Sequence, residues 1–247
     1  MDWNERNGVR WLEASLPGAR GCFTTRLGGA SAGPFESLNL GVLTDDEPEN
    51  VYENRRRLTD AVGIDPDAVL AGHQVHGTEV IAREARPDPN PWVTPGMSLT
   101  DADGQLTHAE GLAPFVFVAD CLPVLLAGPG GVGAVHCGWR GLAGGIVERC
   151  VRELDATAGA IGPGIGQCCY EVGHEFLEQF AGLGDGIAEG RMLDLEEAAR
   201  RLLGEAGVDQ VESAGLCTSC NPELFFSHRR DEGVTGRQGG LVFRWAG

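Results

Sequence analysis

Residues 124–136 read Val-Leu-Leu-Ala-Gly-Pro-Gly-Gly-Val-Gly-Ala-Val-His, two apolar runs on either side of the turn 128–131. Apolar runs bounded by glycine and proline are typical of strands, and so short a connection joins antiparallel strands. The stretch therefore predicts a β-hairpin, which argues against a purely parallel sheet. We expect an α+β (mixed α/β) fold, a single domain whose mixed, partly antiparallel sheets are flanked by helices.

Other segments carry helical and strand patterns. Asp45-Asp46-Glu47-Pro48 is typical of a helix start, and Val51, Leu58 and Val62 then share one face. Further helices are predicted at 142–154, 175–180 and 195–206, further strands at 115–119 and 241–245, and an exposed proline-dense loop at 86–96. We assign all of them to one catalytic domain over residues 1–247.

The charge of the chain excludes several kinds of function. The formal net charge is −17, and arginine supplies all 19 basic residues because the sequence contains no lysine. Schiff-base chemistry and a phosphate-binding lysine are therefore excluded. A chain with this negative charge repels nucleic acid and anionic membranes. We therefore expect neither as a partner. The one cationic run, 55–57, lies on a predicted helix whose spacing spreads it around the axis.

The N-terminus has no basic, apolar leader pattern, and no apolar stretch is long enough to span a bilayer. The density of the 8 cysteines is not that of a disulfide scaffold. Both observations predict a cytoplasmic protein with reduced thiols. In such a protein, cysteine more often serves metal binding or catalysis than disulfide formation. The oligomeric state is not predicted.

Metal-binding residue types occur at strand ends and tight turns in three segments. Gln74-Val75-His76-Gly77, Ala119-Asp120-Cys121-Leu122-Pro123 and 136–141 together offer two histidines and one cysteine. This is the ligand set of an open zinc site whose fourth position holds water. Most histidines in an ordinary domain are surface or hydrogen-bonded residues, so residue types alone favour that interpretation and leave the metal site as the alternative.

Six segments, in order, identify a resemblance over nearly the whole chain. They are similar to the laccase-domain family, also called polyphenol oxidase-like or peptidoglycan editing factor proteins. The segments are FTTRLGGASAGPFESLNLG (23–41), HQVHGTEV (73–80), ADCLPVLL (119–126), HCGWRGLAGGIVE (136–148), GPGIGQCCYEVG (162–173) and FFSHRRDEGVTGR (225–237). Cys137 and His228 depart from the family pattern, which more often has alanine and tyrosine there.

The resemblance implies a mononuclear metal site at His76, Cys121 and His136. Zinc is the implied cofactor, and copper would occupy the same ligands. Implied activities are phosphorolysis of adenosine, inosine, guanosine and methylthioadenosine, and deamination of adenosine. The substrates would be small molecules, a purine nucleoside and phosphate. Alternative functions are a hydrolase that edits peptidoglycan precursors, a copper-loaded polyphenol oxidase, and a non-enzymatic metal-binding protein that acts through a partner.

These activities require further residues around the metal. Zinc lowers the pKa of its water to about 7, giving a nucleophile for deamination, and Asp120 beside Cys121 is the candidate for proton transfer or for orienting the loop. Cys121 is the alternative nucleophile of the hydrolase. Without lysine, phosphate must be held by arginine or by backbone amides. The candidates inside the shared segments are Arg26, Arg140, Arg229 and Arg230.

Three more patterns receive an interpretation. Asn39 would bind substrate or brace its loop, and Trp139 is expected to pack. Cys217 and Cys220 form a lone C-x-x-C pair, which cannot close a four-ligand zinc site. We therefore expect them, like Cys168 and Cys169, to be buried reduced thiols.

Overall fold

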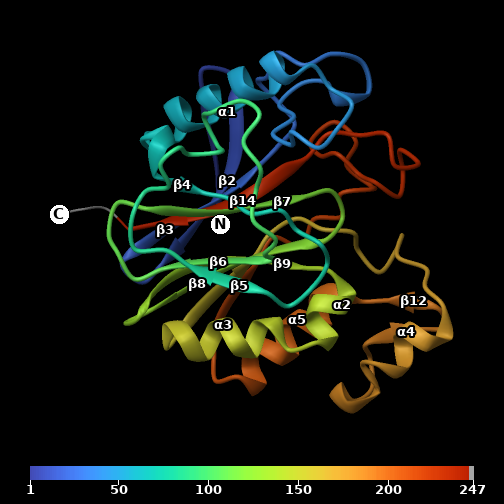
Figure 1. Ribbon diagram of the computed structural model, residues 1–247. Helices are drawn as coiled ribbons and strands as arrows, with labels where there is room; N and C mark the ends of the chain where they lie inside the picture. The colour runs from blue at the N-terminus through green and yellow to red at the C-terminus, as the bar shows by residue number, and fades with distance from the viewer. Residues whose placement is uncertain (245–247) are drawn as a thin grey trace.

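Two six-stranded sheets form the middle of the structure, a computed structural model that describes residues 1–244 (Figure 1). The first contains, in order across the sheet, β1 (Asp2–Arg6), β2 (Val9–Leu16), β3 (Ala19–Thr24), β14 (Gln238–Phe243), β7 (Ala113–Val118) and β4 (Val69–Leu70). The second contains β13 (Gln210–Ser213), β10 (Ala158–Ile161), β8 (Leu122–Gly128), β9 (Gly131–Cys137), β6 (Gly104–Thr107) and β5 (Val80–Ala82). A small ribbon pairs β11 (Ala188–Glu189) with β12 (Met192–Leu193).

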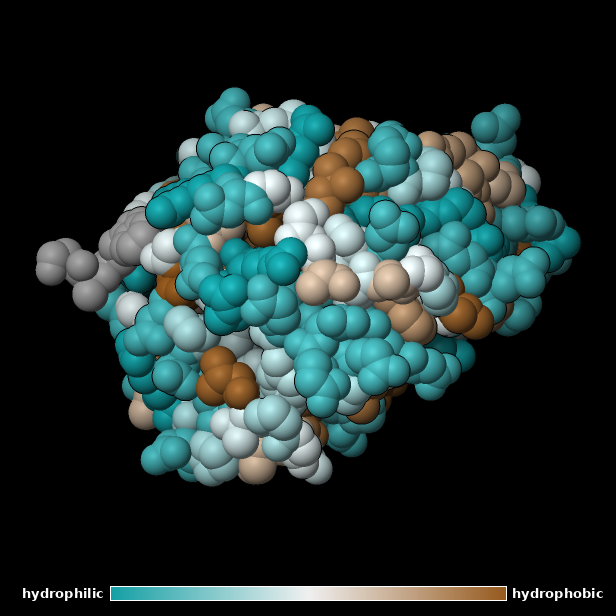
Figure 2. Space-filling view, turned by 90° about the horizontal axis from the view of Figure 1, so that it is seen from above, coloured by the Kyte–Doolittle hydropathy of each residue, from teal (hydrophilic) through white to brown (hydrophobic). Residues whose placement is uncertain are grey.

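Helices cover the outer faces of the two sheets. The helices are α1 (Pro48–Val62), α2 (Trp139–Ala143), α3 (Ile146–Leu154), α4 (His174–Glu178) and α5 (Leu195–Glu205), with short 3-10 turns at Gly33–Phe35, Pro66–Ala68 and Ala181–Leu183. In Figure 1, α1 lies over the first sheet, and α2, α3 and α5 lie over the second. The result is four layers, helix, sheet, sheet and helices. Figure 2 views the molecule from the α1 side and shows a mostly hydrophilic face.

Three hydrophobic clusters fill the spaces between these layers. One lies between α1 and the first sheet, one between the sheets, and one between the second sheet and its helices. Strand β8 contributes to two of them, with Val124 and Leu126 toward the helices and Leu125 and Ala127 toward the first sheet. Successive side chains of a strand point to opposite faces, so a strand buried on both faces must be apolar throughout. This explains the continuous apolar run of the hairpin.

The predicted fold class is confirmed. The two runs of the hairpin are β8 and β9, paired antiparallel from Leu122 and Cys137 to Gly128 and Gly131. Both large sheets are mixed, because β4 with β7, β5 with β6 and β10 with β13 are parallel pairs. The predicted strand 115–119 is β7, the strand 241–245 is β14, and the helix 195–206 is α5. Trp245 lies outside the described residues, and the single catalytic domain over 1–247 stays a prediction.

The predicted helix 142–154 is wrong in one respect. The structure has two helices, α2 and α3, separated at Gly144 and Gly145. Gly145 has a φ of +82°, and a Cβ on Gly144 would lie 2.5 Å from Cγ2 of Thr78. Both glycines are therefore needed where the chain turns tightly against the loop that follows β4.

The predicted exposed loop 86–96 is only partly exposed. Trp92 is 1% exposed and Asn90 is 3% exposed. The Trp92 ring packs against Phe115 at a centroid distance of 4.8 Å, and the Asn90 amide donates to the carbonyl oxygens of Asp67 and Val69. The prolines mark a loop correctly, but one tryptophan anchors it in the core beside α1.

The sequence predicted that the three arginines 55–57 spread around their helix, but not that one of them is buried. Arg55 on α1 is 1% exposed. Its guanidinium lies 4.5 Å from the Trp92 ring. Its nitrogens donate to the carbonyl oxygens of Leu40, Pro91 and Trp92 at 2.9, 3.1 and 3.1 Å. Burial lowers the pKa of Arg55 to about 10. The side chain therefore ties α1 to two loops that carry no regular structure.

We predict that Arg55→Ala lowers the free energy of unfolding by roughly 2–4 kcal/mol, because it leaves buried carbonyl oxygens unpaired and a cavity beside Trp92. Urea unfolding followed by circular dichroism measures the change. The matched control is Arg56→Ala on the same helix, whose partners Glu53 and Asp60 lie at the surface. Equal effects of the two substitutions would show that the buried contacts of Arg55 do not hold the loops.

Candidate metal centre and adjoining pocket

His76, Cys121 and His136 meet at one end of the sheets. His76 lies between β4 and β5, Cys121 between β7 and β8, and His136 near the end of β9. Their ligand atoms all lie within 4.8 Å of one another, and the two imidazole rings meet edge to face at a centroid distance of 4.9 Å. The hairpin register pairs Leu122 with Cys137. The pairing that decides the fold therefore also places Cys121 beside His136.

The carboxylate of Asp103 holds the ring of His136 and the backbone of His76 in place. It is fully buried just before β6. It accepts a hydrogen bond from Nδ1 of His136 at 2.7 Å, and others from the backbone N–H groups of Val75, His76 and Gly77 at 3.2, 3.0 and 2.8 Å. A histidine fixed at Nδ1 presents Nε2 to a metal, and such carboxylate partners orient metal-binding histidines. The sequence patterns gave no sign of Asp103.

Charge at the centre favours a thiolate. Burial opposes ionisation of Cys121, but the charges and hydrogen bonds of His136 and His76 outweigh it and lower the pKa of Cys121 to about 6. Burial also disfavours the protonated form of His136, yet the negative groups Cys121 and Asp103 raise the pKa of its imidazole. A cation that binds between these groups would displace the imidazole proton.

The three residues fit a zinc-class ion. One thiolate and two imidazoles are donors that zinc and copper both accept. Gly138 leaves space beside these ligands, because a Cβ there would lie 3.1 Å from Sγ of Cys121 and 3.3 Å from Cδ2 of His76. With three protein ligands, a tetrahedral ion keeps one position for water or substrate. His76, Cys121 and His136 all line one cavity, so an ion held by them would lie beside a space that a ligand can enter.

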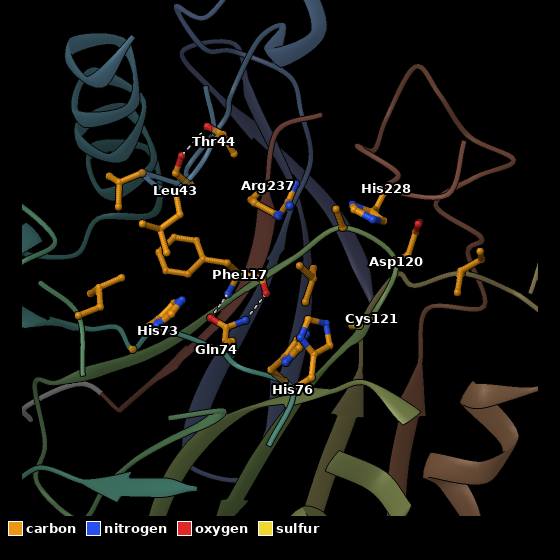
Figure 3. Close-up of a pocket in the computed structure, with 18 of the residues that line it drawn as sticks. Leu43, Thr44, His73, Gln74, His76, Phe117, Asp120, Cys121, His228 and Arg237 are labelled. Atoms are coloured by element: carbon orange, nitrogen blue, oxygen red, sulfur yellow. Dashed lines mark hydrogen bonds between the residues drawn. The ribbon is translucent and has the colours of Figure 1, made fainter. Parts of the chain in front are cut away.

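The cavity beside the three ligands has a volume of ≈ 410 Å³. Its apolar lining includes Leu43, Phe117 and Tyr170. The amide of Gln74 fixes Phe117 by hydrogen bonds to both its backbone N–H and its carbonyl oxygen, as the dashed lines in Figure 3 show. The remaining polar lining is formed by Thr44, His73, Asp120, His228, Arg229 and Arg237. A cavity of this size with apolar walls and few polar groups is typical of small-molecule sites.

Two arginines line this cavity. Arg229, a predicted candidate, is exposed and donates from Nη1 to the carbonyl oxygen of Glu171 at 3.2 Å. Arg237 was missed, although it ends the shared segment 225–237. Figure 3 shows Arg237 on the side of the pocket opposite Gln74 and His76. Burial lowers the pKa of Arg237, and its Nη1 donates to the carbonyl oxygens of Thr235 and Gly236.

The other predicted arginines do not line the cavity. Arg26 donates to the carbonyl oxygens of Glu36 and Pro222 and stacks on Phe226. Arg230 donates to those of Thr218 and Phe225 and pairs with Asp231. Arg140 is exposed on α2, over the ring of Trp139. Adjacent residues point in different directions, so a segment shared with a family does not say which of its arginines reaches a ligand.

Two further predicted residues act on loops. Asn39 is fully buried; its amide donates to Thr44 and Asp46, and its oxygen accepts from the backbone of Gly41 and Arg237. It therefore braces its loop, one of the two roles predicted. Trp139 packs edge to face on Phe176 at 4.3 Å, as expected.

Asp120 lines the cavity but is only 7% exposed. One carboxylate oxygen accepts from the Thr218 hydroxyl at 2.6 Å, and the other accepts from the backbone N–H of Arg229 at 2.7 Å. Its φ is +90°, a conformation that these contacts stabilise. The geometry favours the orienting role of Asp120, because both oxygens are occupied.

The expectation for the cysteine pairs is wrong. Cys168 and Cys220 are exposed, and Cys169 and Cys217 are half-buried. The four sulfurs lie within 4.8 Å of one another, forming a second cluster of possible metal ligands among residues 1–244. The spacing of Cys217 and Cys220 alone could not reveal this cluster, because the other pair lies far away in the sequence.

A family model described as multi-copper polyphenol oxidoreductase laccase matches residues 20–245. The chain belongs to this family. A relative named purine nucleoside phosphorylase from Deinococcus radiodurans is 40% identical, over 95% of this chain and 93% of the relative. Purine nucleoside phosphorylase YfiH of Escherichia coli is 35% identical, over 92% of this chain and 94% of that relative. The crystal structure of YlmD from Geobacillus stearothermophilus superposes with a TM-score of 0.89 at 35% identity, covering 98% of both chains.

The predicted family is therefore confirmed, and the names of the relatives support an enzyme of the nucleoside phosphorylase kind. Among residues 1–244, none of the helices combines the length and apolar character that crossing a membrane requires.

We predict that Asp103→Asn weakens zinc binding by roughly 10–100-fold, the usual effect of removing a carboxylate that orients a metal-binding histidine. Competition with a chromophoric zinc chelator measures the affinity. Asp101→Asn is the control, because this exposed residue removes the same charge from the same loop and pairs with His73 instead of a metal ligand. Zinc binding by Asp103→Asn as tight as that of the unchanged protein would contradict the role given to Asp103.

Proposed function

We propose that this chain is a cytoplasmic, zinc-dependent purine nucleoside phosphorylase. Its substrates would be adenosine, inosine, guanosine and methylthioadenosine, and it would also deaminate adenosine. The observation that carries the proposal is that the three metal ligands and Arg237 line one cavity. A phosphorolytic site needs a phosphate-binding cation beside the position of the sugar, and this chain has no lysine to provide it. The names of the relatives support the same activity.

His76, Cys121 and His136 would hold the zinc ion. When bound, zinc supplies Lewis acidity, which lowers the pKa of water and polarises an electronegative atom of a substrate. The chain holds these three groups from separate segments and keeps His136 in one orientation through Asp103.

The apolar wall suits the base of a nucleoside. Phe117 and Tyr170 offer ring faces on which a purine can stack. Gln74 fixes the backbone at Phe117, and the Phe117 ring packs against Trp92 and Phe115. This ring therefore does not need to be ordered when substrate binds.

Arg237 is the best candidate for phosphate. No salt bridge joins it to a carboxylate within residues 1–244, and burial works against its charge. A phosphate ion would compensate that charge with bidentate hydrogen bonds. Arg229, exposed at the same cavity, would add a second cation. Asp120, held by Thr218 and by the backbone of Arg229, would position both Arg229 and Cys121.

Phosphorolysis breaks the bond between the anomeric carbon and the purine nitrogen while a phosphate oxygen bonds to that carbon. The departing purine then needs a proton. His73 lies in the cavity, and its Nδ1 is 2.8 Å from Oδ1 of Asp101. This contact orients the ring and leaves Nε2 free to carry a proton to a ligand. His228, at the other end of the cavity in Figure 3, is a second imidazole for that transfer.

Copper is a second candidate for the same ligands. Two imidazoles and a thiolate also form copper sites, and copper exceeds zinc in intrinsic affinity for such donors. The description of the family model supports this alternative. With dioxygen as the electron acceptor, a copper-loaded chain would oxidise phenols at the expense of nucleoside turnover, because one set of ligands serves either ion.

The decisive experiment incubates zinc-loaded protein with adenosine, with and without phosphate, and separates the products. We expect adenine and ribose 1-phosphate only with phosphate, and inosine in both conditions, because water is the nucleophile in deamination. The copper-loaded protein is assayed in parallel with a phenol. If protein of verified zinc content forms none of the nucleoside products, the proposal is wrong, and phenol oxidation would then favour the copper function.

We predict that Arg237→Ala raises the KM for phosphate more than tenfold, since a bidentate charge-assisted contact contributes about 1.5–3 kcal/mol. Deamination of adenosine should change much less, because it needs no phosphate. Arg140→Ala, at an exposed arginine outside the cavity, is the control for removing one positive charge. Equal loss of both reactions in Arg237→Ala would instead mean that Arg237 binds the nucleoside or holds the loop.

A further inference from the structure

Four cysteines from two distant segments converge away from the centre described above. Cys168 and Cys169 follow β10, and Cys217 and Cys220 follow β13. Sγ of Cys220 lies 3.5 Å from Sγ of Cys168 and 3.4 Å from Sγ of Cys169. All four sulfurs lie within 4.8 Å of one another. None of them lines the cavity that holds the three-ligand centre.

These separations match a tetrahedral thiolate site. A zinc–sulfur distance of about 2.3 Å places the sulfurs of a tetrahedron about 3.8 Å apart. The separations of 3.5 and 3.4 Å from Cys220 are slightly shorter than that value, and no pair is more than 4.8 Å apart. Small rotations of the side chains would therefore complete the geometry. Bonded sulfurs would be separated by only about 2.05 Å, and all four cysteines are free.

The backbone around the cluster is shaped for the sulfurs. The N–H of Gly166 donates to Sγ of Cys217 at 3.2 Å, a contact that stabilises a thiolate. A Cβ on Gly166 would lie 3.2 Å from Cβ of Cys217 and 3.4 Å from Sγ of Cys168, closer than side chains normally approach. Asn221 closes the C-x-x-C turn by donating to the carbonyl oxygen of Cys217 at 2.8 Å.

We propose that Cys168, Cys169, Cys217 and Cys220 bind one zinc ion in a closed, structural site. Four thiolates are the donor set of structural zinc, and they leave no position for substrate. The site is independent of the proposed phosphorylase activity, because its ligands and those of the catalytic centre do not overlap.

The ion would join two segments that both support the pocket. The carbonyl oxygen of Asp120 accepts from Ile165, just before the first pair of ligands, and its side chain accepts from Thr218, inside the second pair. Tyr170, directly after Cys169, lines the cavity. A zinc ion here would therefore fix the wall that carries Tyr170 and Asp120, without contacting substrate.

Zinc content separates the two sites. Protein purified under reducing, zinc-replete conditions and then dialysed without chelator should contain two zinc ions per chain by mass spectrometry of metals. Cys168→Ser/Cys220→Ser should retain one. Cys121→Ser, which leaves the four-cysteine cluster unchanged, should also retain one. Ser219→Ala, within the C-x-x-C turn but without a ligand atom, should retain two.

Cobalt substitution identifies the surviving site in each variant. Thiolate-to-cobalt charge-transfer absorption grows with the number of thiolate ligands. It should therefore stay strong in Cys121→Ser and fall to a small fraction in Cys168→Ser/Cys220→Ser. The Cys121→Ser arm keeps the test valid even if the double variant does not fold.

A Cys121→Ser protein that holds no zinc would overturn the proposal. So would an unchanged protein with one zinc per chain if Cys168→Ser/Cys220→Ser keeps that zinc. The proposal would also be wrong if mass spectrometry found a disulfide among these four cysteines in protein that holds only one zinc. Because the readout is metal content, failure of this site and failure of the proposed phosphorylase activity are distinguishable.

Discussion

The buried carboxylate of Asp103 connects the sheet to the candidate metal centre. It accepts hydrogen bonds from three successive backbone N–H groups of residues 75–77 and from the ring of His136. The loop at 75–77 runs from β4 in the first sheet to β5 in the second. One side chain therefore fixes the crossing between the sheets, holds the backbone of His76 at a φ of +60° and orients His136.

Close packing of the two sheets supports that arrangement. Gly21 on β3 faces Leu125, and a Cβ there would lie 2.8 Å from Cδ1 of that leucine. Gly240 on β14 is similar, because a Cβ on this glycine would lie only 3.0 Å from Cβ of Pro123. Small residues on the first sheet thus let β8 approach, and β8 begins directly after Cys121. The position of Cys121 depends on how closely the sheets pack, so a change in this core would move a side chain of the candidate metal centre.

The sequence predicted the elements whose patterns are local. The hairpin of β8 and β9 and the helix α1 rest on short segments. The candidate metal centre came from the family resemblance, and the structure brings its three side chains together. The sequence did not predict which arginine faces the cavity, because the directions of Arg230 and Arg237 are set by contacts with distant segments. Asp103 was missed for the same reason: nothing near it in sequence marks a carboxylate that binds residues 75–77.

The four-cysteine cluster was missed because its two pairs are far apart in the chain and meet only when β10 and β13 pair in parallel. The parallel bridge between Gly164 and Cys217 continues this pairing beyond the strands, and it sets the C-x-x-C turn against Cys168 and Cys169. The same extension brings Thr218 to the carboxylate of Asp120. The register at one edge of the second sheet therefore determines both the peripheral sulfur cluster and the wall of the central pocket. For this reason the conformation at Asp120 and Cys121 depends on pairing at β13, although β10 and β8 separate β13 from His136 on β9.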